Sequence, residues 1–115
     1  MKAIAKPVDL FVGMNGTERE FAIRLEADRR NGKIEAWRFE AITLVLAPDC
    51  RYTPDFFIVE CDGSITVAET KGYWRDDAKI KIRVAARLFP EFTFTAYRKR
   101  PKKDGGGWID EQFTP

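Results

Sequence analysis

Two acidic residues and a lysine stand near one another in the middle of this 115-residue chain. Asp55 heads one apolar run, and Glu69 and Lys71 close the next run fourteen residues later. Carboxylate oxygens and backbone carbonyls are ligands that Mg²⁺ accepts, and a neighbouring lysine can orient a nucleophile or offset charge on a phosphoryl oxygen. These residues predict metal-dependent phosphodiester hydrolysis, with Asp55, Glu69 and the backbone carbonyl of Thr70 as metal ligands.

A β-hairpin is the element that would bring these groups together. The two apolar runs flank a glycine-containing turn at residues 61–64, which is a hairpin signal. Side chains two apart on a strand share a face, so Glu69 and Lys71 project together, and Asp55 lies opposite the end of their strand. Acids and lysines also alternate on the solvent face of ordinary hairpins, so this spacing alone favours a structural interpretation.

Three separated blocks of sequence change that balance. They are Gly16-Thr17-Glu18, Tyr52-Thr53-Pro54-Asp55-Phe56, and the stretch from Val67 to Lys79 that contains Glu69-Thr70-Lys71. In order and spacing, the blocks resemble the PD-(D/E)xK nucleases, and specifically the small bacteriophage junction-resolving enzymes of the endonuclease I type. The resemblance covers roughly residues 14–97 and implies an α/β fold with a mixed central sheet flanked by helices.

The resemblance also implies roles for single residues. Glu18, Asp55 and Glu69 match the acidic metal-site residues, and Lys71 matches the catalytic lysine. Glu20 is a competing candidate for the acid on the helix. The implied cofactor is Mg²⁺, for which Mn²⁺ would substitute, and no organic cofactor is expected.

The implied substrate is branched DNA, above all the four-way Holliday junction. A phage or prophage protein acting in the host cytoplasm is expected, and a homodimer would cut two opposing strands. Two other functions remain open. One is a nickase or single-strand endonuclease of phage replication or repair. The other is a DNA-binding module without catalysis, against which the intact Asp55, Glu69 and Lys71 argue.

Basic residues gather in two runs, over residues 75–87 and 98–103, although the net charge is only +2. Such runs are often no more than solvated surface, but next to a nuclease site they predict phosphate contacts. About five contacts would give a log-log salt dependence with a slope of about −4 to −5. The predicted DNA-binding residues are Arg75, Lys79, Arg98, Lys99, Arg100, Lys102 and Lys103.

Composition excludes several classes of site. The chain has no histidine, so histidine-dependent triads and histidine metal sites are ruled out. Cys50 and Cys61 are too few for a zinc site, and reduced thiols are expected of them. No apolar stretch approaches the roughly 18 residues of a membrane span, and the first residues lack a signal-peptide core, so no membrane association is expected.

The remaining pattern predicts the elements around the hairpin. A helix is expected over residues 18–30, with Thr17 as N-cap and Glu20 as the capping-box acid. One long strand should follow over residues 34–46. A second helix should span residues 75–89 and lead through a crossover to a last strand at residues 92–96, parallel to the strand of Glu69.

These elements predict a single nuclease domain over residues 1–100. Residues 1–13 would form an N-terminal arm. Residues 101–115, which are basic and contain three consecutive glycines, predict a mobile C-terminal tail with Trp108 as an anchor.

Overall fold

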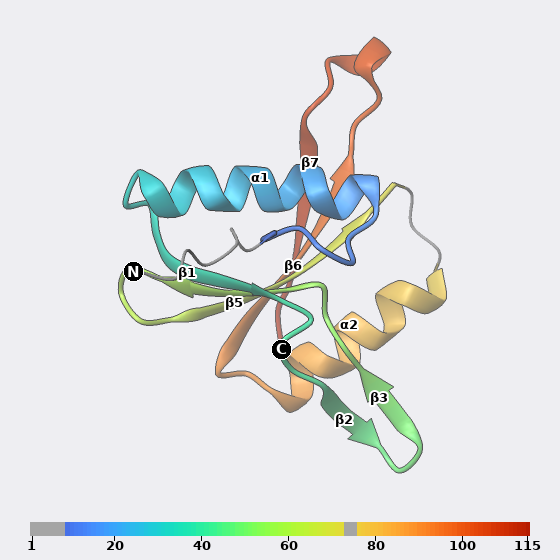
Figure 1. Cartoon of the computed structure of the whole chain (residues 1–115). Helices are drawn as coiled ribbons and strands as arrows, with labels where there is room; N and C mark the ends of the chain where they lie inside the picture. The colour runs from blue at the N-terminus through green and yellow to red at the C-terminus, as the bar shows by residue number, and fades with distance from the viewer. Residues whose placement is uncertain (1–8, 73–75) are drawn as a thin grey trace.

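Two helices flank a twisted sheet in the computed structural model, which describes residues 9–72 and 76–115 (Figure 1). In chain order, the elements are α1 (Gly16–Arg30), β1 (Ile34–Phe39), β2 (Leu44–Ala47), β3 (Cys50–Tyr52), β4 (Phe56–Glu60), β5 (Ile65–Lys71), α2 (Asp76–Leu88), β6 (Phe92–Lys99), the 3₁₀ turn η1 (Lys102–Asp104) and β7 (Trp108–Phe113).

The main sheet has five strands in the order β1-β4-β5-β6-β7. β5 and β6 are parallel, and the other neighbouring pairs are antiparallel. The predicted hairpin, the parallel return through α2 and the mixed sheet with flanking helices are therefore confirmed. No helix in the described part of the chain is long and apolar enough to cross a membrane.

Each helix covers its own face of the sheet with its own core. Val67 and Phe94 pack with α2, whereas Phe56 and Ala68 pack with α1. Consecutive strand residues such as Val67 and Ala68 belong to opposite cores because side chains alternate across a sheet. Both faces are thus covered, which fixes the register of the strands that carry the site.

α1 begins earlier than predicted, and its cap is a different residue. Asn15 is the N-cap: its side chain accepts a hydrogen bond from the backbone N–H of Glu18, and the Glu18 carboxylate accepts one from the backbone N–H of Asn15. The prediction of Thr17 as N-cap and Glu20 as capping-box acid was wrong. Asn15 lies three residues before Glu18, which is the spacing that reciprocal capping requires.

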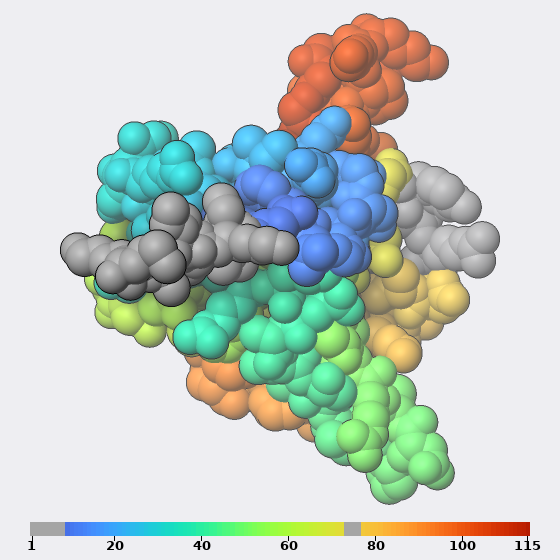
Figure 2. Space-filling model, viewed as in Figure 1, coloured from blue at the N-terminus to red at the C-terminus, as the bar shows by residue number. Residues whose placement is uncertain are grey.

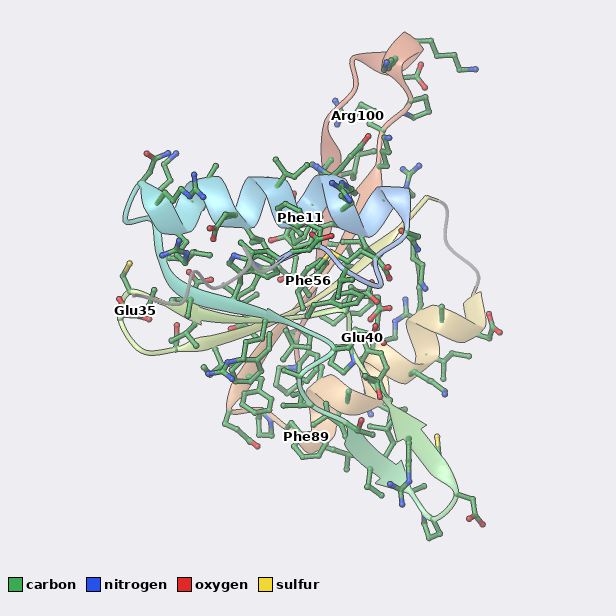
Figure 3. All side chains as sticks on the ribbon, viewed as in Figure 1. Phe11, Glu35, Glu40, Phe56, Phe89 and Arg100 are labelled. Carbon is green, nitrogen blue, oxygen red and sulfur yellow. The ribbon has the colours of Figure 1, made fainter. Side chains whose placement is uncertain are left out.

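The single strand predicted over residues 34–46 is broken in two. Glu40 has a φ of 49° and donates its backbone N–H to the carbonyl of Asp55 at 2.8 Å. The left-handed conformation turns the chain away from β4 after β1, as Figure 3 shows around the labelled Glu40. β2 then pairs with β3 in a separate two-stranded hairpin that projects from the body (Figure 1).

Residues 101–115 form no tail. β7 pairs antiparallel with β6 along its whole length, and Phe113 is a buried member of the α2 core. Trp108 does anchor the segment, packing edge-on against Phe21 of α1. The glycines that suggested mobility have positive φ and form the return of a long hairpin between β6 and β7.

The N-terminal segment and α2 differ from their predictions in smaller ways. Of the predicted N-terminal arm, residues 1–8 lie outside the described residues, while Phe11 stacks on Trp37 of β1. α2 ends at Leu88, one residue before the predicted end, and buries Ile82, Ala85 and Ala86 against the sheet. Small alanine side chains allow the helix backbone to approach the sheet closely, and α2 lies against β6 and β7.

Candidate active site

The start of β4 and the end of β5 carry the two central acids. Phe56 pairs with Ala68 across the antiparallel hairpin. Asp55 directly precedes Phe56 and Glu69 directly follows Ala68, so the two acids stand opposite each other. Phe56 is fully buried between α1 and the sheet (Figure 3) and fixes this register. Asp55 and Glu69 are only 8% and 7% exposed, which is unusual for carboxylates without a cation against each of them.

Hydrogen bonds orient both carboxylates. Asp55 Oδ2 accepts from the backbone N–H of Thr70 at 2.9 Å and from its hydroxyl at 3.1 Å. Glu69 Oε2 accepts from the hydroxyl of Tyr52 at 2.6 Å. Lys71 Nζ lies 3.6 Å from Glu69 Oε1. With Oδ2 and Oε2 engaged by the protein, Oδ1 of Asp55 and Oε1 of Glu69 are the oxygens that would meet a ligand.

Burial is the main electrostatic feature of the pair. It raises the pKa of Asp55, the negative charges of Glu69 and Glu18 raise it further, and the two bonds from Thr70 only partly oppose them. Burial also raises the pKa of Glu69, although Tyr52 and Lys71 stabilise its charged form. A divalent cation would offset the repulsion between the two carboxylates, so the donor set fits Mg²⁺.

The two candidate helical acids have different surroundings. Glu18 raises the pKa of Asp55 through its charge, so it lies on the site side, although its carboxylate also caps α1. Glu20 instead forms an ion pair with Lys99 at 2.8 Å. Within residues 9–72 and 76–115, no three acidic or cysteine side chains lie close enough to form a metal site by themselves. Direct coordination would therefore fall to Asp55 and Glu69.

A hollow of about 260 Å³ opens beside Glu69 and Lys71. Lys81 of α2 reaches across it and donates to the carbonyl of Arg51 at 3.1 Å. The lining residues are Arg51, Tyr52, Thr53, Glu69, Lys71, Ala78, Lys81 and Ile82. A larger hollow of about 480 Å³ between α2 and β7 contains one acid, Glu111, and no buried carboxylate pair, so the smaller one is the better candidate.

Six of the seven predicted DNA-binding residues lie in the described part of the chain, and these six divide into three groups. Lys79 and Lys99 form ion pairs with Glu111 and Glu20. Arg98 is half-buried, whereas three other cations are exposed on the hairpin between β6 and β7. Those three are Arg100, Lys102 and Lys103. Arg75 lies outside the described residues.

Sequence reasoning missed the contributions of three side chains. Tyr52 and Thr70 orient the carboxylates, and Lys81 adds a positive charge to the hollow. Tyr52 stands three residues before Asp55, at the end of β3. β3 was not predicted, because it pairs with β2 only when the chain turns away after β1. For Thr70 only the backbone carbonyl was predicted to take part, whereas its hydroxyl donates a hydrogen bond to Asp55, which precedes the neighbouring strand.

No family model, curated protein or solved structure matches this chain. The likeness to PD-(D/E)xK nucleases therefore stays a prediction from the three sequence blocks.

Proposed function

We propose that this protein is a Mg²⁺-dependent DNA endonuclease with a PD-(D/E)xK core. One observation carries the proposal: two buried carboxylates, Asp55 and Glu69, face each other with Lys71 3.6 Å from one of them. Burying two acids side by side is unfavourable for folding, so the arrangement needs a reason other than stability. Perturbed carboxylates beside a hollow are typical of functional sites.

The holders of the metal would be Asp55, Glu69 and the backbone carbonyl of Thr70, with Glu18 contributing negative charge nearby. Mg²⁺ usually takes one or two protein carboxylates and keeps several waters, which suits this small donor set, and Mn²⁺ should substitute. When bound, the cation would supply charge neutralisation at the phosphodiester and a more acidic water.

The chain's own residues supply the rest of the chemistry. Lys71 is half-exposed at the mouth of the hollow, where its ammonium group can donate hydrogen bonds to the attacking water or to a phosphoryl oxygen. Tyr52 and Thr70 hold the two carboxylates in fixed orientations, so little reorganisation is needed when substrate arrives. In-line hydrolysis would leave a phosphate on one strand end and a hydroxyl on the other.

The proposed substrate is branched DNA, and four-way junctions in particular. This part of the proposal rests on the sequence resemblance and on the exposed cations between β6 and β7. One site in one chain cuts one strand, so paired cuts need two copies, and a homodimer belongs to the proposal.

The test is cleavage of labelled four-way junction, splayed-arm, single-stranded and linear duplex DNA, with Mg²⁺, Mn²⁺ or EDTA. Lys71→Ala and Asp55→Asn serve as site variants. Lys33→Ala serves as the surface control, because Lys33 is exposed and lies near the turn of the hairpin, at the opposite end from Asp55 and Glu69. We expect metal-dependent paired cuts in the junction, lost in both site variants and kept in the control.

Other outcomes have clear meanings. Preferred cutting of single strands, or of only one strand, would keep the site and indicate a nickase or single-strand endonuclease. A folded wild type that binds DNA but cuts no substrate with either metal would overturn the enzyme and leave a binding module.

A further inference from the structure

The hairpin between β6 and β7 extends well beyond the sheet. β5 ends at Lys71, which pairs with Arg98, so the chain from residue 99 onward has no β5 neighbour. Its two strands continue to pair with each other through Lys99 and Trp108. We call residues 99–107 the arm. Figures 1 and 2 show it rising from the body on the side opposite the β2–β3 hairpin.

The base of the arm is fixed to α1, the helix that also carries Glu18. Trp108 packs edge-on against Phe21 with ring centroids 5.4 Å apart, and Lys99 forms an ion pair with Glu20 at 2.8 Å. These two contacts hold both strands of the hairpin to α1 and so resist bending at its base. The arm therefore has a defined direction relative to the candidate site.

The tip is also closed by hydrogen bonds. Asp104 and Gly106 both donate backbone N–H groups to the carbonyl of Pro101, at 3.0 Å each. Gly105, Gly106 and Gly107 have φ values of 105°, 67° and 75°, a region that residues with a Cβ rarely occupy. The three glycines thus form a specific return at the tip of the arm.

The exposed charge of the arm is mostly positive. Arg100, Lys102 and Lys103 are exposed, and Asp104 is the one acid on the segment. The arm is also nearly without apolar side chains, which excludes a typical protein-docking surface. Cations presented on a rigid, polar projection fit the phosphates of a nucleic acid.

The strand geometry sets the reach of the arm. Arg98 is level with Lys71, and strand-like pairing continues to Arg100, whose backbone N–H donates to the carbonyl of Gly107 at 2.9 Å. At about 3.3 Å per residue to Arg100 and about 2 Å per residue into the 3₁₀ turn, residue 103 lies at most about 13 Å beyond the level of Lys71. Along one DNA strand, successive phosphates advance about 3.4 Å along the helix axis, so this reach corresponds to at most about four base pairs. We propose that the arm binds the backbone of duplex DNA within about four base pairs of the phosphodiester bond at the site; the placement relative to that bond rests on the proposed function.

The first experiment measures DNA affinity against salt concentration, with Ca²⁺ in place of Mg²⁺ so that binding is separate from cleavage. The arm variant is Lys102→Ala/Lys103→Ala. The matched control, Lys33→Ala/Arg38→Ala, removes two exposed cations next to and on β1, at the other edge of the sheet. Each lost phosphate contact should reduce the salt slope by about 0.9, so the arm variant should lose about 1.8 and the control nothing.

The second experiment varies the length of duplex beside the cleavage point. Wild-type cleavage should fall about tenfold when that duplex is trimmed from ten to two base pairs, the loss expected when two phosphate contacts disappear at moderate salt. The arm variant should already cut the long substrate about tenfold more slowly and should respond little to trimming. Both arm substitutions are on exposed side chains, and circular dichroism checks that the fold is kept.

The outcomes separate this inference from the proposed function. Equal salt slopes for the arm and control variants, with cleavage intact, would overturn the arm's role and leave the nuclease. An arm-dependent slope without any cleavage would support the DNA contact and overturn the enzyme. A wild type that neither binds nor cuts DNA would overturn both.

Discussion

Two regions of the molecule bury carboxylates in opposite ways. Glu26 on α1 is 8% exposed and accepts hydrogen bonds from Arg29 and from the indole N–H of Trp37, with Arg30 close by. The hydrogen bond from Arg29, followed by that from Trp37, lowers the pKa of Glu26 to about 2. In that environment the charged form stabilises the fold.

Asp55 and Glu69 are buried to the same degree but face each other, with one lysine at the edge of the pair. Burial and mutual repulsion raise the pKa of Asp55, and burial raises that of Glu69. The contrast shows that burial alone does not identify a site. A buried acid surrounded by donors is typical of a structural role, whereas two buried acids that share too few donors fit the proposed cation site.

The largest difference between the regions should be in catalysis. Lys71→Ala and Asp55→Asn should each lower the Mg²⁺-dependent cleavage rate by about a thousandfold, because in the proposed function each removes a group that acts in the transition state. Glu26→Gln should cut DNA at close to the wild-type rate under conditions where it is folded. Single-turnover rates on a labelled junction measure this, and a strong loss of rate in folded Glu26→Gln would erase the distinction.

For the free energy of unfolding, the loss should instead come from changing Glu26. Glu26→Gln should lower the free energy of unfolding by about 2 kcal/mol at pH 7, because it leaves Arg29 and Arg30 without their carboxylate. Urea denaturation measures the change, with Glu35→Gln, an exposed acid on β1, as control.

The pH dependence of that loss has a definite sign. A lowered folded-state pKa stabilises the fold above the unfolded value of 4.5, and the contribution disappears as pH falls toward the folded value of about 2. The difference between wild type and Glu26→Gln should therefore narrow between those values. An unchanged difference down to pH 2 would contradict this account of Glu26.

Metal binding should depend on the bond that orients Glu69. Tyr52→Phe removes only the hydroxyl that donates to Glu69 Oε2, and should weaken Ca²⁺ binding about tenfold, as loss of an orienting partner commonly does. Tyr97→Phe is the matched control, a half-buried tyrosine on β6 that packs against Phe21 on the α1 side. Isothermal titration calorimetry measures both, and equal affinities would show that Tyr52 has no part in orienting the ligand.

The smallest expected effect is a gain in stability at the site. In EDTA at pH 8, Asp55→Asn should raise the free energy of unfolding by about 1 kcal/mol, because it removes a buried charge that repels Glu69 while an amide oxygen can still accept from Thr70. A raised folded-state pKa destabilises the fold as pH rises, so the gain should vanish below about pH 4, where an aspartate is protonated in both states. Destabilisation at pH 8 would show that the carboxylate supports the fold.

Sequence patterns predicted the site hairpin, α2, the parallel return to β6 and the meeting of Asp55 with Glu69. Those features depend on local signals, namely alternation, a glycine turn and a proline stop. The break after β1 was missed because Glu40, a residue without special turn preference, adopts a positive φ for a hydrogen bond to Asp55. β7 was missed because the glycines and charges near it are typical of a mobile tail. Its pairing with β6 and the burial of Phe113 are long-range contacts that local patterns do not predict.

By itself, the sequence determined which chemistry is available: two acids, a lysine and no histidine, at spacings that a hairpin brings together. Only the tertiary structure decided how those groups are held, through Tyr52, Thr70 and the two covered faces of the sheet. It also turned a basic, glycine-rich segment into a paired hairpin with a hydrogen-bonded tip. The physical reason is that residue types and local periodicity are written in the chain, whereas the partner of each buried polar group comes from distant segments that meet only on folding.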